Sequence, residues 1–200
     1  MCPRLLVTGF GPFPGAPRNP TEALVERIVQ RADLGLRAIV VGRVLATTWA
    51  EIEAFPALLR EIDPDAVLML GLARRARTFR IERVARARVA AAVDAEGRRG
   101  KPSTASGPAA LATTAPAHAI VTAIRARGLP AAVSDDAGAY LCNALYRSAL
   151  AIAAGRPTVF LHLPPTRDLT PTSRFGVVDL ERGVAAAIPA LLAGITRRSA

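Results

Sequence analysis

The sequence contains two cysteines and two histidines, and one residue of each type lies where it could take part in nucleophilic catalysis. Cys142 follows the turn SDDAGAY at the expected start of a helix. Free backbone N–H groups and the positive end of the helix dipole favour a thiolate there. The amide of Cys142 could also donate a hydrogen bond to the oxyanion that forms when a carbonyl is attacked. A small buried apolar residue would suit the same position, so the thiol alone leaves both interpretations open.

His162 is the better placed of the two candidate bases. It lies near the end of the apolar run TVFLHL, at the carboxyl edge of an expected strand and just before Pro164 and Pro165. An imidazole at this edge could take the proton of a thiol and later return it to a leaving amine. His118 lies in an Ala-rich expected helix with no acid or thiol close in sequence, which favours a structural or surface role.

Glu82 is the acid best suited to hold such an imidazole in the useful tautomer. It lies in the otherwise apolar and basic stretch RIERVA, where an isolated carboxylate needs a reason to be buried. An ion pair with Arg80 or Arg83 is the alternative, and surface pairs of that kind contribute little. The hypothesis is a triad of Cys142, His162 and Glu82.

Short apolar runs that alternate with helical patterns predict the elements that position these residues. Strands are expected at 4–8, 36–45, 66–72, 79–84, 131–134 and 158–163. Helices are expected from Pro20, capped by Asn19, and at 49–62, 111–127, 141–154 and 179–197, with a loop at 101–108. Such alternation predicts a mainly parallel sheet with helices on both faces and reactive groups at its carboxyl edge. Residues 1–200 are expected to form a single domain, because no linker or repeat interrupts them.

The composition makes several classes of protein unlikely on physical grounds. No segment approaches the roughly 20 apolar residues of a membrane-spanning helix, and the start MCPRLLVTGFGPF lacks a secretory signal, so we expect a cytoplasmic protein without a membrane partner. Cys2 and Cys142 form no disulfide framework and no zinc motif, so no metal is expected. The net charge of +10 raises the question of nucleic-acid binding. The cations are scattered along the chain, so no specific nucleic-acid partner is expected.

The first turn, TGFGPFPG, suggests an apolar binding slot. Its glycines, Gly9, Gly11 and Gly15, do not match the dinucleotide-binding pattern G-x-G-x-x-G. Phe10 and Phe13 would also crowd a phosphate. Two phenylalanines in a turn rich in glycine and proline suit a flat, uncharged ring instead.

Four separated motifs in this order resemble the pyroglutamyl peptidase I family (cysteine peptidase family C15): VTGFGPF with NPTEAL, LGLA with IERVA, DAGAYLCN, and FLHLPP. The family removes N-terminal pyroglutamyl residues through a thioester intermediate. The resemblance implies that Cys142 is the nucleophile, His162 the base and Glu82 the orienting acid. It also implies a three-layer α/β/α sandwich with a mixed sheet, no cofactor, a small peptide substrate with a blocked N-terminus, and a homo-oligomer.

The resemblance also assigns a substrate pocket. Phe10 and Phe13 fall on positions that line the pocket for the pyrrolidone ring in the family. Leu72 falls on a position whose backbone helps to hold that ring, and Tyr140 matches an aromatic pocket position.

Two segments depart from the family pattern. After LGLA the family has a small glycine-containing turn with one Arg, whereas this chain has the run 74–77, RRAR. The family also has an Asp-Ala-Arg segment past the catalytic Glu, where this chain reads RVAAAVD, so Arg86 or Arg88 would have to supply the missing guanidinium. The altered loop 74–94 suggests one alternative, a divergent cysteine hydrolase of another small N-acyl or cyclic amide. The surplus of arginine suggests another, a catalytically idle relative that binds through its basic surface.

Overall fold

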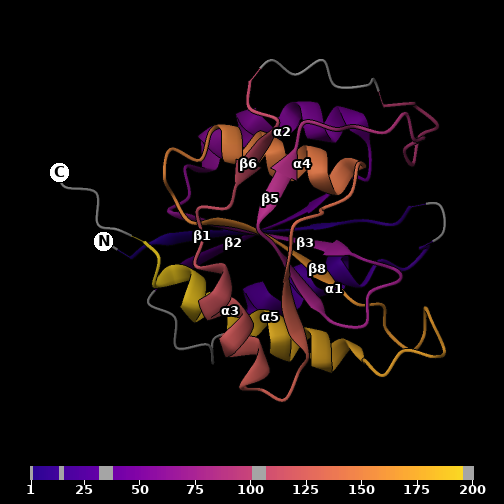
Figure 1. Cartoon of the computed structure of the whole chain (residues 1–200), viewed down its shortest axis with the longest axis vertical. Helices are drawn as coiled ribbons and strands as arrows, with labels where there is room; N and C mark the ends of the chain where they lie inside the picture. The colour runs from indigo at the N-terminus through magenta and orange to yellow at the C-terminus, as the bar shows by residue number, and fades with distance from the viewer. Residues whose placement is uncertain (1, 14–15, 32–37, 101–106, 196–200) are drawn as a thin grey trace.

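The computed structural model describes residues 2–13, 16–31, 38–100 and 107–195 and has a six-stranded sheet between two layers of helices (Figure 1). The strands are β1 (Arg4–Phe10), β2 (Ile39–Leu45), β3 (Ala66–Leu72), β4 (Phe79–Glu82), β7 (Ala131–Ser134) and β8 (Thr158–Leu163). Their order is β2-β1-β3-β8-β4-β7. Four strands run parallel, β4 pairs antiparallel with β8, and β7 pairs parallel with β4. The expected α/β/α sandwich with a mainly parallel mixed sheet is confirmed.

Helices cover both faces of this sheet. In Figure 1, α2 (Trp49–Ile62) and α4 (Leu141–Ala151) lie above it, and α1 (Pro20–Gln30), α3 (Ala117–Arg125) and α5 (Val177–Leu192) lie below it. The central strands β3 and β8 are buried along almost their whole length, which explains their continuous apolar runs. The Asn19 side chain caps α1 by accepting a hydrogen bond from the Thr21 N–H, as its position predicts.

The pleat of the strands decides which layer each site residue faces. In β8, Val159, Leu161 and Leu163 pack in the core with α1, α3 and α5, whereas Phe160 packs in the core with α2 and α4. Because successive side chains alternate between faces, His162 points to the same side as Phe160. In β4, Phe79 and Ile81 pack in the core with α1, α3 and α5. Arg80 and Glu82 therefore face the side of the sheet that α4 covers.

One expected helix was wrong in its first part. The helix expected at 111–127 begins only at Ala117, and Ala110–Ala112 instead forms strand β6, antiparallel to β5 (Val84–Arg86). A helix through the whole segment would have placed Pro116 in its interior, where the ring removes one hydrogen bond and clashes with the preceding turn. The Thr113 hydroxyl also donates to the Thr158 carbonyl oxygen at 2.8 Å, which ties this segment to β8.

The remaining boundaries differ by a few residues. The strand expected at 79–84 ends at Glu82, and the chain then continues into β5. The helix expected at 141–154 ends at Ala151, and Ala154 has a φ of 48° that a helix cannot contain. The last helix spans Val177–Leu192 instead of 179–197. Parts of the expected loop at 101–108 and of the expected elements at 36–45 and 179–197 lie outside the described residues.

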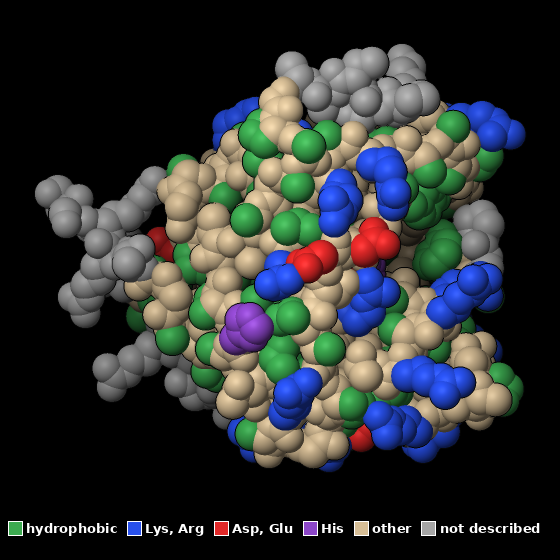
Figure 2. Space-filling view, in the orientation of Figure 1, with side chains coloured by type: hydrophobic (Ala, Val, Ile, Leu, Met, Phe, Trp, Pro, Cys, Tyr) green, Lys and Arg blue, Asp and Glu red, His purple; other side chains and the backbone are tan. Residues whose placement is uncertain are grey.

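On the face drawn in Figure 2 the basic side chains are dispersed, and acidic side chains lie among those near the centre. Within the described part of the chain, none of the helices has the length and apolar character required to cross a bilayer.

Candidate active site

Cys142 lies in the first turn of α4, with its side chain partly exposed. The preceding turn is held by Asp136, whose Oδ1 accepts a hydrogen bond from the Gly138 N–H at 3.0 Å, and Gly138 has a φ of 83°. The N-cap residue Tyr140 makes no side-chain hydrogen bond to the helix. The first-turn N–H groups, including that of Cys142, therefore remain available to an anion at the sulfur.

His162 lies at the carboxyl end of β8 and binds Glu82 through its ring. Its Nδ1 lies 2.8 Å from Glu82 Oε1, which leaves Nε2 for a second partner. Burial opposes protonation of the ring, but hydrogen bonding and negative charge from Cys142 and Glu82 outweigh it and raise the pKa of His162 to about 9. The ring is therefore held as an imidazolium over most of the neutral range.

Glu82 is fully buried and joins two cations. Besides His162, its Oε1 lies 3.4 Å from Arg80 Nε, so the ion pair considered from the sequence coexists with the histidine contact. Arg83 instead pairs with Asp135. A carboxylate without solvent is stable only when paired, and here the imidazolium and the guanidinium provide that pairing.

Gly71 makes the space that the sulfur occupies. It is the register partner of His162 across β3 and β8, and a Cβ built on it would lie 3.2 Å from Cys142 Sγ. The same Cβ would lie 2.6 Å from the Phe160 ring, which packs against His162 with 4.7 Å between ring centroids. A residue without a side chain is therefore required at this point of β3.

We expect Gly71→Ala to lower kcat/KM by on the order of 10- to 100-fold, because the added methyl must displace the Phe160 ring or the Cys142 sulfur. Steady-state kinetics on a pyroglutamyl amide would measure the loss. Gly11→Ala is the matched control, since its Cβ would meet only the Leu45 carbonyl oxygen at 3.7 Å. Equal activity of Gly71→Ala and wild type would contradict this account of the sulfur position.

The predicted residues surround one cavity of about 330 Å³, here named the Cys142 cavity. Six of the seven predicted site residues line it: Phe10, Phe13, Leu72, Tyr140, Cys142 and His162. Glu82 does not line it and reaches the site through the His162 ring. The structure thus brings together residues from the first turn, β3, β8 and α4.

Several lining residues were not singled out from the sequence as site residues. Asn19 was expected only as a helix cap, yet it lines the cavity and donates from Nδ2 to the Gly11 carbonyl oxygen at 3.1 Å. Thr47 lines it too and donates its hydroxyl to the same oxygen at 3.0 Å. Arg80 also lines it and binds the Ser134 hydroxyl and the Asp136 carbonyl oxygen, which fixes the turn before Cys142. No motif flagged these contacts, because each depends on residues distant in sequence.

Tyr140 lines the cavity and is bonded to the segment that follows β5. Its hydroxyl donates to the Val93 carbonyl oxygen at 2.9 Å, and its ring meets Trp49 edge to face at 5.6 Å between centroids. Burial, together with the negative charges of Asp94 and Cys142, raises the pKa of Tyr140. The phenol therefore stays neutral and keeps its hydrogen bond.

Arg86 and Arg88 do not line the cavity. Neither therefore supplies the guanidinium that, from the sequence, one of them would have to provide in place of the arginine in the family pattern. Arg86 Nη2 donates to the Asp135 carbonyl oxygen at 3.2 Å, and Arg88 lies 3.7 Å from Asp136 Oδ1. Asn143 fixes the backbone of both, donating from Nδ2 to their carbonyl oxygens. The guanidinium groups that line the cavity belong to Arg74 and Arg80.

Where the chain is described, no three His, Cys, Asp or Glu side chains gather closely enough to hold a metal ion.

His118 lies exposed on α3, away from the lining of the Cys142 cavity, and its carbonyl oxygen accepts a hydrogen bond from Thr122.

Comparisons with known proteins agree with one another. The pyrrolidone-carboxylate peptidase of Clavibacter michiganensis is 36% identical over 204 residues, which is 97% of this chain and 95% of that protein. The enzyme of the same name from Mycobacterium tuberculosis H37Rv is 36% identical over 177 residues, 80% of this chain and 77% of that protein. Both alignments extend over most of the two sequences compared.

Solved structures are similar over the whole fold. The pyroglutamyl peptidase I of Bacillus amyloliquefaciens superposes with a TM-score of 0.87 at 27% identity, covering 100% of both chains. The pyrrolidone carboxyl peptidase of Thermococcus litoralis gives 0.86 at 28% identity, covering 96% of this chain and 94% of that one. The family model described as pyroglutamyl peptidase matches residues 3–186. The chain therefore belongs to the pyroglutamyl peptidase family of cysteine peptidases.

Proposed function

We propose that this protein is a cysteine peptidase that removes an N-terminal pyroglutamyl residue from peptides, with Cys142 as nucleophile, His162 as base and acid, and Glu82 as the residue that orients His162. The observation that carries the proposal is that Cys142 and His162 line one cavity while the buried Glu82 binds the His162 ring from eighty positions away in the sequence. The 2.8 Å contact between His162 and Glu82 supports the tautomer that the chemistry requires.

In the first half of the reaction the Cys142 thiolate attacks the carbonyl carbon that joins the pyroglutamyl residue to the next residue. The electron pair of the carbonyl moves onto oxygen, and the Cys142 N–H at the helix start donates to this oxyanion. The His162 imidazolium then gives its Nε2 proton to the leaving nitrogen as the C–N bond breaks. A thioester remains on the sulfur, and the shortened peptide departs.

In the second half, His162 takes a proton from a water molecule that attacks the thioester. The C–S bond breaks, pyroglutamate is released, and the thiolate–imidazolium pair is restored. Glu82 keeps its hydrogen bond to Nδ1 throughout, so each proton passes through Nε2 alone.

The lining of the Cys142 cavity suits a pyrrolidone ring. Phe10 and Phe13 offer apolar faces to a flat ring, while the polar residues Asn19 and Thr47 also line the cavity. A lactam has one N–H and one carbonyl oxygen and no charge, so it needs few polar partners. A free glutamate would bring both a carboxylate and an ammonium into this apolar setting, at a large cost in desolvation.

The direct test is hydrolysis of a pyroglutamyl chromogenic amide by the purified protein, beside the matching prolyl and glutamyl amides. Release from the pyroglutamyl amide alone is expected, because the prolyl ring lacks the lactam oxygen and the glutamyl group is charged. Turnover of other N-acyl or cyclic amides in preference to it would favour the divergent hydrolase. A folded protein that hydrolyses none of them would favour the idle relative. The cytoplasmic location and the homo-oligomer expected from the sequence stay predictions.

Phe13→Ala is expected to raise KM for the pyroglutamyl amide roughly 10-fold with little change in kcat, because a half-buried phenyl face is lost from ring binding and not from the reacting atoms. Steady-state kinetics would separate the two constants. Val178→Ala removes a side chain that is 62% exposed on α5 and serves as the control. A fall in kcat at constant KM would contradict the assignment of Phe13 to substrate binding.

A further inference from the structure

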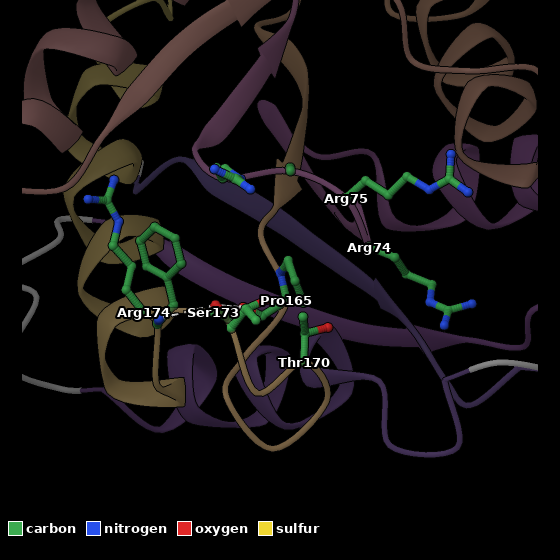
Figure 3. Close-up of a pocket in the computed structure, with 10 residues that line it drawn as sticks. Arg74, Arg75, Pro165, Thr170, Ser173 and Arg174 are labelled. Carbon is green, nitrogen blue, oxygen red and sulfur yellow. Dashed lines mark hydrogen bonds between the residues drawn. The ribbon is translucent and has the colours of Figure 1, made fainter.

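A second cavity, of about 580 Å³, adjoins the Cys142 cavity. It lies between the loop that follows β3 and the segment that follows β8, and we name it the arginine cavity after four of its lining residues, Arg74, Arg75, Arg77 and Arg174. Arg74 lines both cavities. In Figure 3, Arg174 stands on one side, Arg74 and Arg75 extend on the other, and Pro165, Thr170 and Ser173 lie between them.

The arginine cavity is positively charged and uncompensated. All four arginines are exposed, and the lining contains no carboxylate. Within the described ranges, none of the four forms an ion pair, whereas Arg83 pairs with Asp135 and Arg27 with Glu181. Like charges held around one hollow repel each other, so an anion placed among them would be stabilised by all four.

The floor of the arginine cavity is ordered and can seat a ligand. Pro165 and Phe175 are buried, and the Arg174 guanidinium lies 5.3 Å from the centroid of the Phe175 ring, which leaves its N–H edge free. The Ser173 hydroxyl is used within the segment, donating to the Pro165 carbonyl oxygen at 2.5 Å. Thr170 and Thr172 line the same hollow and make no side-chain hydrogen bond in the described structure, so their hydroxyls are available to a ligand.

The arginine cavity lies next to the Cys142 cavity, beyond the carboxyl ends of β3 and β8. Arg74 follows β3 two residues after Leu72, and Pro165 follows β8 three residues after His162, so both borders of the arginine cavity continue from walls of the Cys142 cavity. A peptide whose first ring fills the Cys142 cavity has its scissile nitrogen at His162. Arg74 lines both cavities, so it lies within reach of the residues that follow the scissile bond.

We infer that the arginine cavity binds carboxylates of the leaving peptide, so that pyroglutamyl peptides with acidic residues, or with a free carboxyl terminus, soon after the pyroglutamyl residue are the preferred substrates. The inference rests on the proposed function. Guanidinium groups match carboxylates geometrically through paired N–H donors, which favours this ligand over an uncharged peptide.

The test compares three peptides that differ only in charge: pGlu-Ala-Glu-Glu-amide, pGlu-Ala-Gln-Gln-amide and pGlu-Ala-Gln-Gln with a free carboxyl terminus. The measured quantity is kcat/KM relative to the neutral amide. We expect a ratio of about 5- to 20-fold for the acidic amide, because exposed charge pairs each contribute modestly, and less for the single terminal carboxylate. The two charged peptides separate side-chain from terminal recognition. The ratio should fall toward 1 in about 0.5 M salt, where exposed charges are screened.

The double variant Arg75→Gln/Arg174→Gln removes two of the four guanidinium groups and is expected to lower the ratio toward 1. Any effect common to all substrates cancels in this ratio. Arg60→Gln removes an exposed arginine on α2, away from both cavities, and should keep the wild-type ratio. Ratios of 1 in the wild type, with the neutral amide still hydrolysed, would overturn the inference and leave the proposed function standing. A wild-type ratio that the double variant does not lower would overturn it as well.

A second measurement keeps the inference testable should no pyroglutamyl compound be hydrolysed, which would refute the proposed function. Calorimetric binding of Ala-Glu-Glu-amide is expected to be about 5- to 20-fold tighter than that of Ala-Gln-Gln-amide, for the same electrostatic reason. Equal binding would overturn the inference. Binding of a single-stranded oligonucleotide that the double variant abolishes, without preference for the acidic peptide, would assign the arginine cavity to nucleic acid and overturn it too.

Discussion

Cys142→Ser is expected to lower kcat/KM for a pyroglutamyl amide by on the order of 10⁴-fold or more, because the hydroxyl that replaces the thiol is far harder to ionise. A serine hydroxyl would remain protonated beside His162 at neutral pH, because its intrinsic acidity is far lower than that of a thiol. The serine oxygen would also be smaller than the sulfur that fills the space beside Gly71. The measurement is the initial rate of amide hydrolysis, with circular dichroism to show that the variant is folded.

Cys2→Ser is the matched control, since Cys2 is the other cysteine of the chain and is exposed. It should keep full activity. Alkylation by iodoacetamide gives an independent readout: loss of activity in the wild type should follow modification of Cys142 and not of Cys2. Hydrolysis at equal rates by Cys142→Ser and wild type would remove Cys142 as the nucleophile and with it the proposed mechanism.

Three strands could be predicted from the sequence because each is a short, mainly apolar run preceded directly by Pro or Asp. The expected ranges 66–72, 131–134 and 158–163 agree with β3, β7 and β8. The antiparallel direction of β4 could not be predicted, since it depends on how the loop after β3 turns the chain back beside β8. Strands β5 and β6 were missed because alanine and arginine favour helix, and only the pairing of the two segments makes them strands.

The site could be predicted in outline for a different reason. Cys142 lies where the turn SDDAGAY gives way to a helical pattern, and His162 lies where an apolar strand ends before Pro164 and Pro165. Both places are expected at the carboxyl edge of the sheet. Arg80 was considered only as an ion-pair partner of Glu82, and its bonds to Ser134 and Asp136 require β4 and β7 to be neighbours. The arginine cavity likewise needs two loops, 74–77 and 165–175, that meet only through the pairing of β3 with β8.

Glu82→Gln is expected to lower kcat/KM by on the order of 100- to 10,000-fold while leaving the protein folded. The amide has the shape of the carboxylate, and its oxygen can still accept from His162 Nδ1. The amide nitrogen would replace Oε2, which makes no hydrogen bond in the described structure. What is lost is the negative charge that stabilises the imidazolium form of His162.

The pH profile distinguishes this role from a purely structural one. The pKa of His162 is raised to about 9 because Cys142 and Glu82 stabilise the charged ring against burial, so wild-type activity should fall as pH rises through about 9, when the imidazolium can no longer protonate the leaving nitrogen. Without the Glu82 charge the pKa of His162 must fall, and the alkaline limb of kcat/KM should move to lower pH. Glu181→Gln, which removes an ion-paired carboxylate on α5, should leave both the rate and that limb unchanged. An alkaline limb at the same pH in Glu82→Gln and wild type would show that Glu82 does not act through His162.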